Sequence, residues 1–195
     1  MCFHIARRVP VVLFTLLSVG CSTTPLDAVI AEDSGISASG GGAGAGACFV
    51  PDAGRFVLES AVDGSCLGAG EPTTVFGNPG FDTTLAVDCT LPAQAWDLTL
   101  ASGTAVYSLE NVGSTDTLDV KMAAVQSGTP VIVYAATGLP NQQFEVRSRG
   151  VSLYELRPQN VTTSCVAAVA QSAQIAACSE SDPAQAWRLE RTDCL

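Results

Sequence analysis

The chain has 195 residues, of which 47% are hydrophobic and 14% are charged, and its formal net charge is −10. A chain with this much negative charge would repel phosphate and sulfate groups. We therefore expect neither a nucleic acid nor another anionic polymer as a partner. Histidine occurs once, at position 4, which excludes Ser/His/Asp and Cys/His catalytic systems and histidine-ligated metals from the rest of the chain.

The N-terminus has the order of a secretory signal peptide. Arg7 and Arg8 precede the apolar run 9–17, and small residues follow up to position 20. The run is far shorter than the roughly 20 apolar residues that span a bilayer, so we predict a leader over residues 1–20. Its removal takes two of the nine basic residues and none of the 19 acidic ones, which leaves a net charge of −12.

Cys21 follows the leader directly, and this placement resembles a lipoprotein signal. The usual Leu three residues earlier is Ser18 here, with Leu17 one position further back, and Ser18 and Gly20 would also suit ordinary signal peptidase. We predict that Cys21 is lipidated and that the protein is held in the bacterial cell envelope. Ser22 is compatible with the outer membrane where the host has one.

A flexible tether and one folded domain follow. Residues 21–47 are mostly Ser, Thr, Ala and Gly, which cannot bury enough apolar surface to offset the entropy of ordering. Residues 48–195 are enough for one ordinary domain.

Six of the eight cysteines fall within that domain, at positions 48, 66, 89, 165, 178 and 194. An even set in an exported chain indicates three disulfides, although six cysteines allow 15 pairings. Metal binding is the competing interpretation, but the sequence has no Cys-x-x-Cys pair, so we expect no metal or cofactor. A lipidated Cys21 also leaves no odd thiol in the mature chain.

The domain repeats one unit three times. Gln-x-aromatic motifs recur at Gln94-Ala95-Trp96, Gln142-Gln143-Phe144 and Gln185-Ala186-Trp187. Each is preceded by an aromatic-x-Leu segment, at Phe56-Val57-Leu58, Tyr107-Ser108-Leu109 and Tyr154-Glu155-Leu156. Short alternating segments separated by Gly, Asn, Asp and Pro predict an all-β domain, and one such unit cannot bury its apolar face alone.

These motifs resemble those of the ricin-type β-trefoil lectins, whose three subdomains each carry a Gln-x-Trp. The resemblance implies an all-β, disulfide-stapled β-trefoil with repeats at about 54–100, 101–149 and 150–191. Other small β-barrels or sandwiches are the alternatives. It also implies the disulfides Cys66–Cys89 and Cys165–Cys178, and Cys48–Cys194 across the two ends of the domain. We expect the motif aromatics Trp96, Phe144 and Trp187 to pack in the core.

In this family a carboxylate, a stacking aromatic ring and an amide hold the sugar. Carried over position by position, they correspond in the second repeat to Asp119, Tyr134 and Asn141, supported by Gln142. One position departs from the family, because Ile132 replaces a polar residue. Alternatively, Asp119 binds backbone amides in a turn, and Tyr134 is an ordinary buried strand residue.

The first and third repeats have lost these residue types. The carboxylate, ring and amide are replaced by Gly68, Val87 and Ala93 in the first repeat and by Ala167, Ala176 and Ala184 in the third. We expect no sugar binding at either.

The sequence therefore favours a carbohydrate-binding, lectin-like lipoprotein with one site, a monomer whose partner is a glycan or a monosaccharide. The resemblance to the family implies a galactose-like sugar. The alternative is a protein-interaction or structural module on the same scaffold. We expect no enzyme, since no residue can be nominated as an activated nucleophile.

Overall fold

Every secondary-structure element that the computed structural model describes is a strand or a one-turn 3₁₀ helix. The described residues are 53–103 and 105–192. Among them, no helix is long and apolar enough to cross a membrane. The predicted leader, the tether, the lipidated Cys21 and the Cys48–Cys194 disulfide lie outside the described residues.

Twelve strands in the described residues fall into three groups of four. The first group is β1 (Gly54–Ser60), β2 (Cys66–Val75), β3 (Asn78–Ala86) and β4 (Ala95–Ser102). The second is β5 (Val106–Asn111), β6 (Thr117–Val120), β7 (Val131–Tyr134) and β8 (Phe144–Gly150). The third is β9 (Leu153–Pro158), β10 (Ser164–Val169), β11 (Ser172–Ala177) and β12 (Trp187–Arg191).

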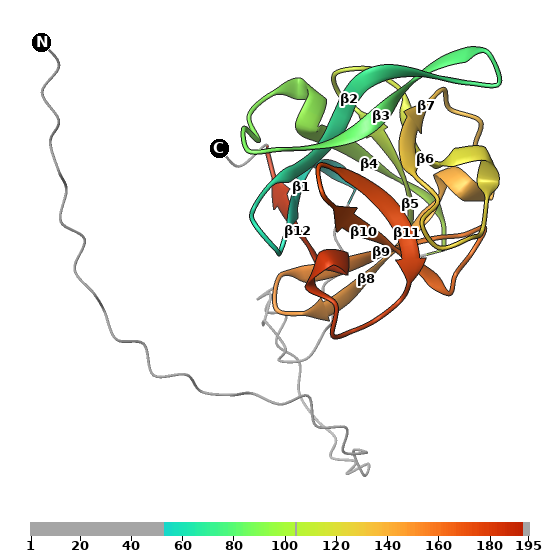
Figure 1. Cartoon of the computed structure of the whole chain (residues 1–195). Helices are drawn as coiled ribbons and strands as arrows, with labels where there is room; N and C mark the ends of the chain where they lie inside the picture. Colours follow the sequence, from blue (N-terminus) through green and yellow to red (C-terminus); the bar gives the residue numbers. More distant parts are fainter. Residues whose placement is uncertain (1–52, 104, 193–195) are drawn as a thin grey trace, which may run out of the picture. The chain divides into compact units, whose positions relative to one another are not determined.

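Six of these strands close into a barrel. The ring runs β1–β4–β5–β8–β9–β12, each strand antiparallel to the next, and β12 pairs with β1 to complete it. The other six strands form the hairpins β2–β3, β6–β7 and β10–β11, one from each repeat (Figure 1). A barrel with three hairpins related by threefold pseudosymmetry is a β-trefoil, so the predicted fold is confirmed.

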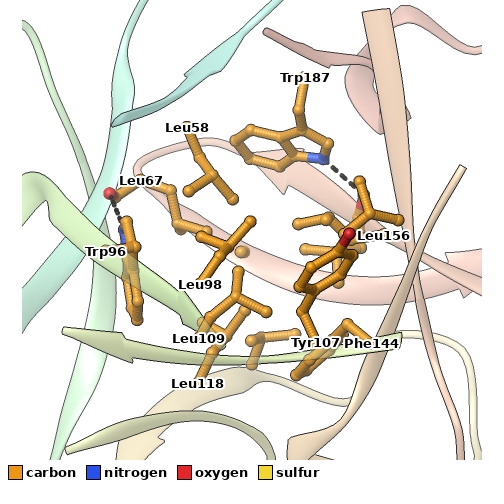
Figure 2. Close-up of a cluster of buried hydrophobic side chains, with 14 of the residues drawn as sticks. Leu58, Leu67, Trp96, Leu98, Tyr107, Leu109, Leu118, Phe144, Leu156 and Trp187 are labelled. Carbon is orange, nitrogen blue, oxygen red and sulfur yellow. Dashed lines mark hydrogen bonds between the residues drawn. The ribbon is translucent and has the colours of Figure 1, made fainter. Parts of the chain in front are cut away.

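The core is made by the inward-facing residues of all three repeats. Leu58, Leu98 and Leu109 have at most 2% of their surface exposed and lie in one cluster with Trp96 and Trp187 (Figure 2). Alternation along each strand turns one face toward this cluster and the other outward. The barrel is therefore filled by side chains and has no central channel.

The Gln-x-aromatic motifs belong to this core, as predicted. Trp96, Phe144 and Trp187 are fully buried. The indole Nε1–H of Trp96 donates to the carbonyl of Leu67 at 2.8 Å, and that of Trp187 donates to the carbonyl of Val166 at 3.0 Å. Each tryptophan thus ties a barrel strand to the first strand of its own repeat's hairpin.

Two disulfides, Cys66–Cys89 and Cys165–Cys178, join the start of a hairpin to the segment that follows it. The equivalent places in the second repeat are Thr117, which is buried, and Ala136. Disulfides persist in oxidising compartments, so these bonds indicate an exported protein.

Candidate carbohydrate-binding site

Asp119 lies in the middle of β6 and is only 4% exposed. Its Oδ2 accepts hydrogen bonds from Asn141 Nδ2 at 2.9 Å and from Gln142 Nε2 at 2.8 Å. Both amides come from the 3₁₀ turn η3 (Pro140–Gln142), which Pro140 initiates because its fixed φ suits a first helical position. The alternative in which Asp119 binds backbone amides in a turn is therefore wrong.

Gln142 connects this carboxylate to the chain that follows β7. Its Nε2 also donates to the carbonyl of Ala135 at 2.9 Å, and its Oε1 accepts from the backbone N–H and the hydroxyl of Thr137. In the third repeat Gln185 likewise donates to the carbonyl of Ala177, although no carboxylate is present there. The motif glutamine is thus a positioning residue that the fold uses with or without a site.

Burial raises the pKa of Asp119 from the usual 3.8 to about 6, although the hydrogen bonds from Gln142 and Asn141 act in the opposite direction. At neutral pH the group is a carboxylate with no cationic partner among the described residues. Its second oxygen, Oδ1, accepts no hydrogen bond from the described part of the chain. That oxygen keeps its full capacity to accept hydrogen bonds from a ligand.

Asp119, Tyr134 and Asn141 line one small hollow of about 190 Å³. Tyr134 ends β7 and is partly exposed, so it is not sealed in the interior. Gly80 of β3 pairs with it, and a Cβ at Gly80 would lie 3.1 Å from the Tyr134 ring. The absent side chain at Gly80 therefore leaves room for the ring. Gln142 does not line the hollow; it contacts Asp119 from behind and ties it to the segment that follows β7.

Apart from Ile132, which the family pattern had placed at the site, the rest of the lining was not predicted from the sequence. The remaining residues are Val75, Phe76, Met122, Ala123, Ile132, Thr137 and Leu139. Asp119 is the one charged residue in this lining. Val75 and Phe76 come from the first repeat, and only the pairing of β3 with β7 brings their hairpin to this place.

In the first repeat the equivalent space is occupied by the protein itself. A Cβ at Gly68 would lie 2.4 Å from the carbonyl oxygen of Ala93 and 2.7 Å from Gln94 Nε2. No carboxylate fits there without a shift of the backbone, because real Cβ atoms do not approach a backbone oxygen so closely. In the third repeat Ala167 is buried and offers no polar group.

One positional assignment in the first repeat is wrong by one residue. Tyr134 pairs with Thr117 across its hairpin, and Ala86 pairs with Cys66 in the same way, so Ala86 and not Val87 holds the place of the ring. Cys89 lies three residues after Ala86, whereas Ala136 lies only two residues after Tyr134. Counting back two residues from Cys89 therefore gives Val87, which is the wrong residue. Neither Ala86 nor Val87 supplies an aromatic ring.

Comparison with known proteins agrees with this architecture. Residues 49–134 match the model of the ricin-type beta-trefoil lectin domain-like family. No curated protein is similar enough in sequence to count as a relative of this chain.

Several solved structures share the fold at low sequence identity. A designed 3-fold symmetric protein, ThreeFoil, is 23% identical with a TM-score of 0.61 over 70% of this chain and 97% of its own. A Polyporus squamosus lectin, bound to the human-type influenza-binding epitope Neu5Aca2-6Galb1-4GlcNAc, is 16% identical with a TM-score of 0.62 over 73% of this chain and 50% of its own. An exo-beta-1,3-galactanase from Clostridium thermocellum is 20% identical with a TM-score of 0.60 over 74% of this chain and 31% of its own.

The alignment thus covers nearly the whole of the designed protein, but only half or less of each of the two natural proteins. At these identities the solved structures establish the fold alone. Residues 49–134 thus match the ricin-type beta-trefoil lectin domain-like family, and the solved structures show that the described domain has the β-trefoil fold.

Proposed function

We propose that this protein binds an uncharged, galactose-like sugar through one site in the second repeat. Asp119, Tyr134 and Asn141 make the contacts, and Gln142 positions the carboxylate. The family match supports carbohydrate binding in general, and the geometry of the hollow favours this repeat. No catalytic step is proposed.

The chemistry of the three side chains suits one face of a hexose. The Asp119 carboxylate can accept from two adjacent hydroxyls, and a hydrogen bond to a charged acceptor contributes about 1.5–3 kcal/mol. The partly exposed ring of Tyr134 can stack on the C–H face of the sugar. The amide of Asn141 spends its N–H groups on Asp119 and Val120, and its oxygen remains available to a hydroxyl.

The observation that carries the proposal is the buried carboxylate. A charged group without a cationic partner destabilises the folded protein, so packing alone gives no reason to keep Asp119 in this place. A sugar that donates hydroxyls to Oδ1 supplies such a reason.

The proposal is tested by glycan-array screening, followed by calorimetric titration of the hexose found. Tyr134→Ala is expected to lower the affinity by at least about tenfold, because the stacking surface is lost. Val151→Ala, at a residue 94% exposed and outside the lining, should bind as the wild type does. Absence of glycan binding by the wild type, with a protein partner that co-purifies, would favour the interaction-module alternative.

We further propose that lipidation of Cys21 holds the domain in the bacterial cell envelope, with residues 21–47 as the tether. A single weak site would then gain avidity from many copies on one membrane. In a bacterial host, the wild type should partition with the membrane fraction, whereas Cys21→Ser should be released as soluble protein. A soluble wild type would rule out the anchor and leave the binding site unaffected.

A further inference from the structure

Three exposed hydrophobic side chains surround the hollow that contains Asp119. We call Phe76, Met122 and Leu139 the apolar rim; they are 79%, 57% and 56% exposed. A single exposed hydrophobic residue is ordinary, but three around one hollow form a surface that favours an apolar group. The rim is assembled from two repeats, since Phe76 belongs to the first repeat and the other two belong to the second.

The long hairpin of the first repeat places Phe76 there. β2 and β3 have ten and nine residues, whereas β6 and β7 have four each. β3 pairs with β7 from Gly80 opposite Tyr134 to Asp82 opposite Ile132, so the hairpin runs beside the site strand (Figure 1). Its two-residue turn, Phe76 and Gly77, therefore lies next to the hollow.

The backbone at this turn indicates that Phe76 is not there for the turn itself. Phe76 and Gly77 have φ values of +52° and +81°, the left-handed conformation of both central residues in a tight hairpin. Such a first position strongly prefers Asn, Asp or Gly, and a bulky side chain is unfavourable in it. A phenylalanine that is both strained and exposed is more consistent with a role in binding than with a role in folding.

Met122 repeats this pattern on the other side of the hollow. It lies in the 3₁₀ turn η2 (Lys121–Ala123), directly after β6, with φ of +59°. The described residues with left-handed φ that are not glycine are Phe76, Thr115, Met122, Ala123, Ser152 and Ala170. The two large hydrophobic residues in that set are the two that belong to the rim.

The chemistry of the rim defines the group that it can receive. Apart from the three predicted contact residues, Thr137 is the one polar residue in the lining, and its hydroxyl already donates to Gln142 Oε1 at 2.8 Å. The side chains of the rim therefore offer no hydrogen-bond donor to an amide or a carboxylate substituent. A methyl group needs no hydrogen-bond partner and gains from contact with Phe76 and Met122.

We infer that the site selects uncharged sugars that carry a methyl substituent, such as a 6-deoxy sugar or a methyl glycoside, with Phe76 and Met122 as the selecting residues. This inference rests on the proposed function, because the hydroxyls of the same sugar must bind Asp119. Phe76 would then contribute to sugar selection from the first repeat, whose own sugar site lacks the required residues.

Calorimetric titration with D-galactose, 6-deoxy-D-galactose and methyl β-D-galactoside tests the inference. We expect at least one methylated form to bind the wild type about fourfold more tightly than galactose, the value of one buried methyl group. The double variant Phe76→Asn and Met122→Asn should lose this preference and bind all three sugars equally. Asparagine tolerates left-handed backbone, so the variant should fold at least as well as the wild type.

Val87→Asn is the matched control, since Val87 is 94% exposed and lies outside the rim, and it should keep the preference. Equal affinity of the wild type for all three sugars would overturn the inference and leave the proposed sugar site standing. A preference that persists in the double variant would also overturn it. Failure of the wild type to bind any of the sugars would overturn the galactose-like function and this inference together.

Discussion

Replacing Asp119 with asparagine is expected to abolish sugar binding and, at pH 7, to raise the free energy of unfolding by about 1–2 kcal/mol, since solvent screens part of the cost of the buried charge. The asparagine oxygen can still accept from Asn141 and Gln142, so the local hydrogen bonds survive. What disappears is the buried charge that raises the pKa of this group from 3.8 to about 6. Chemical unfolding at pH 7 and titration with the bound sugar measure the two effects.

The pH dependence follows from the direction of that shift. Because the folded-state pKa of Asp119 is higher than the unfolded value, its contribution to stability is most favourable below about pH 4 and is lost as the pH rises through about 6. The gain from Asp119→Asn should therefore be largest above pH 6 and vanish near pH 4. Sugar affinity of the wild type should fall in the opposite direction, as acid protonates the carboxylate below pH 6.

Asp97→Asn is a control of opposite sign. Asp97 accepts hydrogen bonds from Arg55 at 2.8 Å, and these lower its pKa. Its loss should not stabilise the protein at pH 7, and it should leave sugar binding intact. If Asp119→Asn proved destabilising at neutral pH, or retained full affinity, the buried carboxylate would not be the binding group that we propose.

Truncation of Trp187 to alanine is expected to lower the free energy of unfolding by about 3–5 kcal/mol, the usual loss for a buried tryptophan. Trp187 is fully buried, and its indole N–H donates to the carbonyl of Val166. The variant leaves a large cavity and a carbonyl without that donor. Thermal or chemical unfolding measures the loss.

Trp187→Phe separates a structural role from a binding role. It keeps most of the apolar volume and matches the second repeat, where Phe144 holds the same place and is also fully buried. We expect an intermediate loss of stability and unchanged sugar affinity, because Trp187 does not line the hollow. A marked loss of affinity in a stably folded Trp187→Phe protein would contradict this assignment.

Much of the scaffold follows from local pattern. Each repeat carries its own buried aromatic and its own hairpin, so three copies of one motif predicted an all-β domain. The resemblance to the ricin-type lectins then implied the trefoil, and Trp96, Phe144 and Trp187 were expected in its core. The resemblance to the ricin-type lectins implied the disulfides Cys66–Cys89 and Cys165–Cys178, and the structure confirms both. Asp119, Tyr134 and Asn141 were carried over from the family's pattern, and the structure places all three in the lining of one hollow.

No sequence motif indicated the apolar rim or the register of the first hairpin. Phe76 and Tyr134 lie in different repeats, and only the pairing of β3 with β7 joins them; no short motif records a contact across that pairing. The sequence analysis assigned the ring position of the first repeat to Val87 by counting back from Cys89. The first repeat has one extra residue before Cys89, and the strand pairing puts Ala86 at that position, because register is set by hydrogen bonds between strands. The burial that raises the pKa of Asp119 is likewise a property of the packed hollow, because a sequence does not show how much water reaches a carboxylate.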